Sequence, residues 1–158
     1  MTDTRWLDED ELRAWLRLAG VMLKLAPALD SQLQRDSAMT HFDYLCLAML
    51  SEAEDRVLPM SELAARVNAS LSRLSHVVSK LECRGWVERF PSPKSRRVTL
   101  ARLAPEGWRV LVEAAPGHVQ TVRSLVFDGL EPDDVAALER IAGHIVERIE
   151  ATGLRTVS

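Results

Sequence analysis

One short stretch of the chain, between Ser70 and Gly85, carries cationic and hydroxyl side chains on one side of a predicted helix. Read with a period of 3.6 residues, this side contains no acidic residue and consists of Ser72, Arg73, Ser75, His76, Ser79 and Lys80. Long cations and short hydroxyls bind phosphate oxygens, and an arginine can contact a guanine edge through two hydrogen bonds. The pattern therefore favours contact with a nucleic acid.

The helix that carries this face is the second of two joined by a tight turn. Ser61 is expected to cap the first helix, and residues 68–70 interrupt the periodicity and supply the next cap. The opposite side of the second helix is apolar and is expected to lie on a core through Leu71, Leu74, Val77, Val78 and Leu81. Gly85 is expected to end this helix.

Two strands are predicted next, at residues 86–90 and 97–102, with a turn between them that contains two prolines and two cations. Residues 57–59 are expected to add a short third strand. The order helix, turn, helix and basic hairpin is typical of a winged helix-turn-helix, in which the second helix enters the major groove. The predicted fold class is mainly α with a small β-hairpin wing.

Charge is distributed unevenly along the chain. Residues 61–102 contain nine Lys or Arg against three Glu, a net charge of +6, whereas residues 1–60 carry −5 and residues 103–158 carry −4. A cationic module on an anionic frame suits oriented binding to phosphates. A solvated charged surface is the alternative explanation of the charge alone.

Several short motifs follow one another along the chain. They are Leu81-Glu82, Arg84-Gly85, Val87-Glu88-Arg89, Arg96-Arg97 and Leu103-Ala104-Pro105-Glu106-Gly107, preceded by residues 39–45. In these motifs the chain resembles the MarR family of bacterial transcriptional regulators. The resemblance implies a sequence-specific, homodimeric regulator of double-stranded DNA, usually a repressor, which binds a pseudo-palindromic operator and in some members is released by a small effector.

The candidate DNA contacts follow from position on the recognition helix and the wing. They are Ser70, Ser72, Arg73, Ser75, His76 and Lys80 on the helix, and Lys94, Arg96 and Arg97 on the wing. Arg73 is expected to reach a guanine and Lys80 a phosphate. His76 has a solvated surface position as its alternative, and Arg97 has a bracing role within the hairpin as its alternative.

The two ends of the chain carry long apolar stripes. The first helix is expected from about Asp8 to Leu33, with Pro27 kinking or interrupting it, and the last helix is expected to end near Ala151. The helix after the wing contains Pro116-Gly117, which either kinks or splits it. Packing the terminal helices against a second copy buries their apolar faces, and a monomeric bundle is the alternative.

The expected organisation has three parts. Residues 1–38 form an N-terminal dimerisation helix, residues 39–104 a winged helix-turn-helix lobe, and residues 105–158 a linking helix followed by a C-terminal dimerisation helix. The resemblance also implies a pocket for a small aromatic effector where the lobe meets the dimerisation helices. The candidate lining residues are Trp15, His41, Phe42, Tyr44 and Trp108.

Other classes of function are less favoured. The chain has no glycine-rich phosphate loop, no GxSxG, no HExxH and no CxxC, so we expect no enzyme, no catalytic residue, no cofactor and no metal site. No apolar run is long enough for a membrane span, and a cytoplasmic protein is expected. Structural roles are predicted for Cys46 and Cys83, and a thiol-based redox-sensing regulator is the alternative. A protein-interaction adaptor with a degenerate winged helix is a further alternative for the function of the chain.

Overall fold

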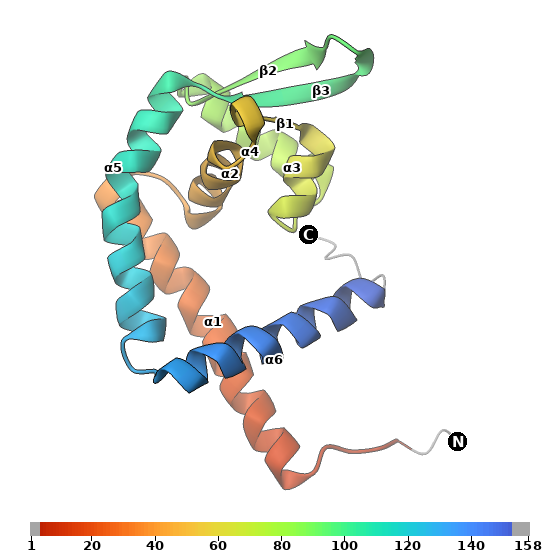
Figure 1. Ribbon diagram of the computed structural model, residues 1–158, viewed down its shortest axis with the longest axis vertical. Coiled ribbons are helices and arrows are strands. Elements are labelled where there is room, and N and C mark those ends of the chain that lie inside the picture. The colour runs from red at the N-terminus through yellow and green to blue at the C-terminus, as the bar shows by residue number, and fades with distance from the viewer. Residues whose placement is uncertain (1–3, 153–158) are drawn as a thin grey trace.

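The computed structural model describes residues 4–152, and its elements are predominantly helical. The helices are α1 (Glu9–Ser37), α2 (His41–Ser51), α3 (Met60–Arg66), α4 (Leu71–Cys83), α5 (Pro105–Val122) and α6 (Pro132–Ala151). A 3-10 turn η1 (Glu54–Arg56) precedes the first strand, and a π-helical turn η2 (Arg123–Phe127) extends α5. The strands are β1 (Val57–Pro59), β2 (Val87–Ser92) and β3 (Ser95–Leu103). Figure 1 shows a helical lobe topped by the strands, with the long helices α1 and α5 leading away from it.

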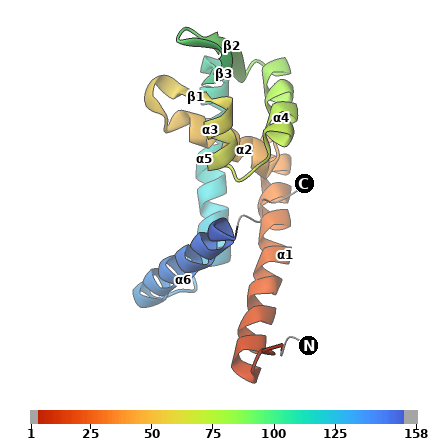
Figure 2. The ribbon, with the colours of Figure 1, turned by 90° about the vertical axis from the view of Figure 1, so that its right-hand side faces the viewer.

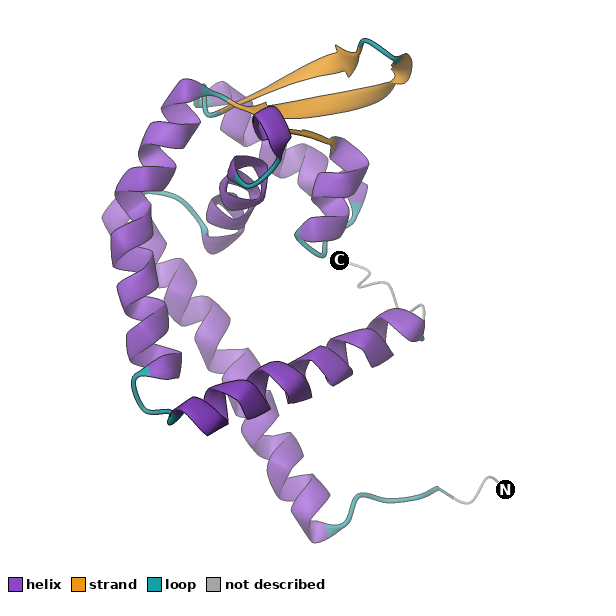
Figure 3. Cartoon of the chain, viewed as in Figure 1, coloured by secondary structure: helices purple, strands orange, loops and turns teal. Residues whose placement is uncertain are grey.

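The three strands form one antiparallel sheet in the order β1-β3-β2. Leu58 of β1 pairs with Ala101 of β3, so the short third strand predicted at residues 57–59 is confirmed. On the other edge Arg89 of β2 also pairs with Ala101, and the hairpin projects beyond the helices (Figure 3). The hairpin is therefore anchored at its base and exposed at its tip.

The core of the lobe lies between α2, α3, α4 and the base of the sheet. Its fully buried members include Leu33, Leu47, Leu50, Leu63, Leu74 and Leu81. Helix α2 starts with a capping box in which the Thr40 hydroxyl accepts from the backbone N–H of Asp43, and the Asp43 carboxylate accepts from the N–H of Thr40. The cap expected at Ser61 is wrong, because α3 begins at Met60 and Pro59 occupies the N-cap position.

Gly107 determines how closely α5 approaches the lobe. A Cβ atom at this position would lie 2.1 Å from the carbonyl oxygen of Trp86, so only glycine fits. That same carbonyl accepts a hydrogen bond of 2.9 Å from the backbone N–H of Ala104. The start of α5 is thereby held against the end of α4.

Both proline-containing helices are continuous. α1 runs through Pro27 to Ser37, beyond the expected end at Leu33, and α5 runs through Pro116 to Val122. Both prolines are exposed, so the carbonyl groups that lose a helical partner can bind water instead. Of the alternatives expected at Pro27 and at Pro116-Gly117, interruption and splitting are therefore excluded for these helices.

α6 differs from the other long helices because it has no buried residue. Figure 2 shows it leaving the end of α5 and lying apart from α1. Its apolar stripe is exposed, as are Leu12, Trp15, Leu16 and Met22 in the N-terminal half of α1. Within residues 4–152, no helix is both long enough and apolar enough to cross a membrane.

Candidate nucleic-acid interface

The predicted recognition helix is α4, and its first turn is held by a cap. The Ser70 hydroxyl accepts from the backbone N–H of Arg73 at 3.2 Å. Ser72, Arg73, His76 and Lys80 are exposed, whereas Leu74 and Val78 on the opposite side are fully buried. The side chains predicted to bind DNA therefore lie on the outer side of the lobe, although Ser70 already uses its hydroxyl as a cap.

Leu71 corrects the sequence prediction. It was expected on the buried stripe of the helix, but 53% of its surface is exposed. Leu71 is the first residue of α4, one turn before the fully buried Leu74. An apolar side chain thus stands at the N-terminus of the recognition helix, beside Ser72 and Arg73.

Arg73 has a partner within the lobe. Its guanidinium lies over the ring of Phe42 on α2, 4.6 Å from the centroid, in a cation–π contact. Among residues 4–152 it forms no ion pair. Its charge therefore remains available to an external acceptor, at the cost of a weak contact to the ring.

Arg89 on β2 fastens the hairpin to α4, a role that the sequence analysis missed. Its Nε donates to Glu82 Oε2 at 2.7 Å, its Nη2 to the Ser79 hydroxyl at 2.9 Å and its Nη1 to the Ser75 hydroxyl at 3.4 Å. Hydrogen bonding from Arg89 lowers the pKa of the Glu82 carboxyl below its usual value. Ser75 and Ser79 are half-buried against this arginine, so their hydroxyls serve the hairpin as well as the outer face. The Val87-Glu88-Arg89 motif was the available signal for this residue.

The tip of the wing carries cations without carboxylate partners. Lys94, Arg96 and Arg97 are exposed, and no carboxylate of residues 4–152 forms an ion pair with any of them. The turn is closed by the backbone N–H of Lys94, which donates to the Ser92 hydroxyl at 3.2 Å. Nearer the base, Arg102 is neutralised by Glu88 at 3.7 Å. Positive charge is thus concentrated at the free end of the hairpin.

Lys80, the remaining predicted contact, reaches inward to α2. Its Nζ lies 2.7 Å from Oδ2 of Asp43, a side chain with only 1% of its surface exposed. The lysine side chain itself is half exposed. Lys80 therefore differs from the wing cations, which have no such partner.

The five predicted effector residues have different partners. His41 and Tyr44 both meet His118 of α5, with ring centroids at 5.4 Å and 4.3 Å. Phe42 lies under Arg73, Trp108 lies under the Arg56 guanidinium at 3.9 Å, and Trp15 is half exposed on α1. His118, which the sequence analysis did not select, is the residue that brings two of the candidates together. Its pKa and that of His41 are lowered, chiefly by burial.

The two cysteines lie in different surroundings. Cys46 is fully buried, and burial together with nearby Asp43 raises the pKa of its thiol to about 12, so its predicted structural role is confirmed. Cys83 is exposed at the end of α4, so the structural role expected for it is not supported.

Comparison with known proteins finds one family. The model for the MarR family matches residues 39–99. The structure of Sco3205, a MarR family transcriptional regulator from Streptomyces coelicolor in complex with DNA, is 41% identical, covers 99% of this chain and 95% of that chain, and superposes with a TM-score of 0.87. AbsC, a MarR family regulator from the same organism, is 34% identical with coverage of 94% and 99% and a TM-score of 0.89. The multiple antibiotic resistance protein MarR of Salmonella typhimurium is 28% identical over 70% of this chain and 74% of its own length.

Proposed function

The chain belongs to the MarR family of transcriptional regulators, so it is a DNA-binding regulator that acts as a homodimer, and from this premise we propose how it binds. It represses transcription by occupying a pseudo-palindromic operator, with one α4 in the major groove of each half-site. Residues 39–104 bind DNA, and residues 1–38 and 105–158 form the dimer frame. The protein works by binding alone, without a catalytic activity, in the cytoplasm.

The observation that carries this proposal is the contrast among the cations of the lobe. Arg66 is paired with Glu62, Arg89 with Glu82 and Arg102 with Glu88. The wing-tip cations Lys94, Arg96 and Arg97 have no such partner among the described residues. Unpaired charge on an exposed hairpin is suited to the phosphates or the minor groove beside the recognition site.

The first turn of α4 supports the reading of bases. Arg73 is proposed to leave the Phe42 ring and bind guanine O6 and N7, assisted by Ser72 and His76. Leu71, exposed beside them, is proposed to contact the C5 methyl group of a thymine. We expect Arg73→Ala to cost about 1–3 kcal/mol of operator binding and to relax specificity at one base pair.

Homodimer symmetry sets the form of the operator. Two lobes related by a two-fold axis require inverted half-sites whose centres lie about 34 Å apart, one turn of the duplex. The exposed apolar faces of α1 and α6 supply the surface that the second chain covers.

A salt titration tests the proposed interface. Binding to a duplex taken from upstream of the protein's own gene is measured at increasing salt concentrations. The double variant Arg96→Gln/Arg97→Gln is expected to bind more weakly, with the slope of log K against log salt reduced by about two. Arg66→Gln is the matched control, because Arg66 is already paired with Glu62. Binding by the wild type that does not depend on salt would contradict the proposal.

A small effector is proposed to act where His41, Tyr44 and His118 meet, because this cluster joins the lobe to α5. A ligand that binds better to a dimer with unsuitable half-site spacing lowers operator affinity by its differential affinity. The test is to titrate small phenolic acids into the operator complex and compare the wild type with Tyr44→Phe and His118→Gln. A compound whose effect is unchanged in both variants acts elsewhere.

A further inference from the structure

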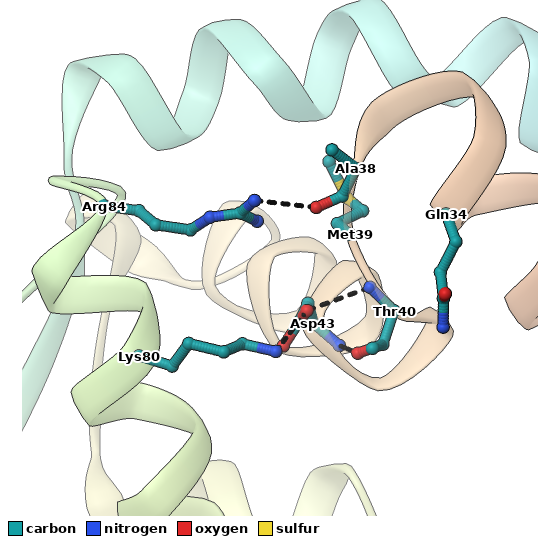
Figure 4. Close-up of a pocket in the computed structure, with 7 residues that line it drawn as sticks. All are labelled: Gln34, Ala38, Met39, Thr40, Asp43, Lys80 and Arg84. Carbon is teal, nitrogen blue, oxygen red and sulfur yellow. Dashed lines mark hydrogen bonds and ion pairs between the residues drawn. The ribbon is translucent and has the colours of Figure 1, made fainter.

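Lys80 of α4 and Asp43 of α2 form an ion pair in which the carboxylate is almost fully buried. The Asp43 Oδ2 atom accepts from Lys80 Nζ at 2.7 Å and from the backbone N–H of Thr40 at 2.9 Å. The second carboxylate oxygen, Oδ1, is buried and has no hydrogen-bond partner. Lys80 is therefore the cation that balances a buried carboxylate (Figure 4).

A second contact holds the end of the same helix. Arg84 Nη2 donates to the carbonyl oxygen of Ala38, the residue that caps α1, at 2.8 Å. A cavity of about 340 Å³ lies between the two contacts and is lined in part by Gln34 and Met39 (Figure 4). The C-terminal half of α4 is thus held at two separated points on the junction between α1 and α2.

This junction belongs to the dimer frame as much as to the lobe. The backbone N–H of His41, at the start of α2, donates to Asp30 Oδ1 of α1 at 2.9 Å. Lys80 consequently connects the recognition helix, through Asp43 and the start of α2, to the long helix α1.

The energetics oppose the sequence prediction that Lys80 binds a phosphate. Moving its ammonium to DNA would leave the Asp43 carboxylate buried without a counterion, and a charge that loses its partner in such a site is strongly unfavourable. The wing cations can bind phosphate without that penalty because they form no ion pair within the described residues 4–152.

We propose that Lys80 is a positioning residue, whose ion pair with Asp43 sets the orientation of α4 and thereby the discrimination between operator and other DNA. The inference rests on the proposed function, in which α4 reads the operator. Contacts to base edges carry the sequence information, whereas contacts to phosphates carry none directly. Loss of the pair should therefore affect operator binding and spare non-specific binding.

The test measures the dissociation constants of Lys80→Met for the operator duplex and for a random duplex of equal length, over a range of salt concentrations. We expect operator affinity to fall about tenfold, similar to the loss of one base contact, and random-duplex affinity to fall much less, with the salt slope unchanged. An equal fall for both duplexes, with the slope reduced by about one, would identify a phosphate contact and overturn the proposal.

Asp43→Asn gives an independent test, because two explanations predict opposite changes in operator binding. Removing an acid from a DNA-binding lobe should, by Coulomb's law alone, strengthen binding to all DNA. The positioning role predicts the opposite for the operator, a lower ratio of operator to random affinity. The double variant Lys80→Met/Asp43→Asn should lower the ratio of operator to random affinity no more than either single variant does, because all three lose the same contact. An unchanged ratio in Asp43→Asn overturns the proposal.

Two further variants complete the design. Lys80→Arg keeps a cation within reach of Asp43 and should restore discrimination, whereas Lys94→Met is a matched charge control that should weaken both duplexes and reduce the slope by about one. Thermal unfolding without DNA checks that each variant is folded. The double variant leaves no buried charge unpaired, so it supplies the decisive result if Lys80→Met does not fold. Wild-type protein that binds neither duplex contradicts the proposed function itself, a result distinct from the failure of this inference.

Discussion

Helices α4 and α6 are both amphipathic, yet only α4 buries its apolar stripe within one chain. Leu74, Val78 and Leu81 of α4 are fully buried, whereas Leu138 and Ile141 of α6 are 42% and 50% exposed. α4 lies on a core completed by α2, α3 and the sheet, whereas no element within residues 4–152 buries any residue of α6. The difference teaches that an apolar stripe indicates that a face will be buried, without indicating which chain will bury it.

The two regions also use charge differently. The wing-tip cations of the lobe form no ion pair within residues 4–152, and we propose that DNA binds there. α6 begins with a capping box and with Asp133 and Asp134 in its first turn, which stabilise the helix through its dipole. In the proposed function, DNA completes the first region and a second copy of the chain completes the second.

The largest effect should come from a charge in the exposed stripe of α6. Ile141→Glu is expected to prevent dimerisation, because a carboxylate cannot be buried against a second apolar helix without a partner. Operator binding should fall more than about 100-fold once two half-sites are no longer bound together. Analytical ultracentrifugation and a binding titration measure the two consequences. Arg140→Glu places the same side chain next to the stripe and is the control. A similar loss of dimerisation in this variant would show that the effect is not specific to the apolar stripe.

A cavity in the lobe should lower the stability of the protein and leave the dimer intact. Leu74→Ala removes a fully buried side chain and is expected to lower the free energy of unfolding by about 2–5 kcal/mol. The dimer should persist, because the stripes of α1 and α6 are untouched. Denaturant unfolding and sedimentation test this separation. Dissociation of a folded Leu74→Ala dimer would mean that the lobe and the frame are not independent.

A smaller effect is expected at the exposed Leu71. Replacing one operator thymine by deoxyuridine removes its methyl group, and at the contacted position wild-type affinity should fall by about 1 kcal/mol. Leu71→Ala should lose affinity for the thymine operator and become insensitive to that replacement. Each operator thymine is replaced in turn and the binding constants are compared. If no position separates the two proteins, Leu71 does not contact a methyl group.

The smallest effect concerns pH at the junction of the two regions. Burial lowers the pKa of His41 and His118 in the folded state, so the unfolded state binds protons more readily. The contribution of the two neutral histidines to stability is complete at pH values above the ordinary histidine pKa of 6.5, and it is lost as the pH falls below that value. The melting temperature should therefore decrease as the pH is lowered from 7.5 to 5.5. The decrease should be smaller in His118→Gln. The exposed His76→Gln is the control and should keep the wild-type profile.

Much of the lobe was predictable because its signals are local. The helices, the turn at residues 68–70, the hairpin and its third strand follow from periodicity, caps and turn residues within a few positions. Continuity through Pro27 and Pro116 was harder to predict, since it depends on whether each unpaired carbonyl faces water. The assignment of Leu71 to the core failed because periodicity does not show where a core ends.

The amino-acid sequence alone determined the order of the elements, the cationic outer face of α4 and the amphipathic helices at both ends. These properties depend on residues near one another in the chain. Only the tertiary structure decided which cations are free, because a partner can lie on a different element. Lys80 meets Asp43 across 37 positions, Arg89 spans from the hairpin to α4, and the cations at the wing tip meet no carboxylate of the described residues.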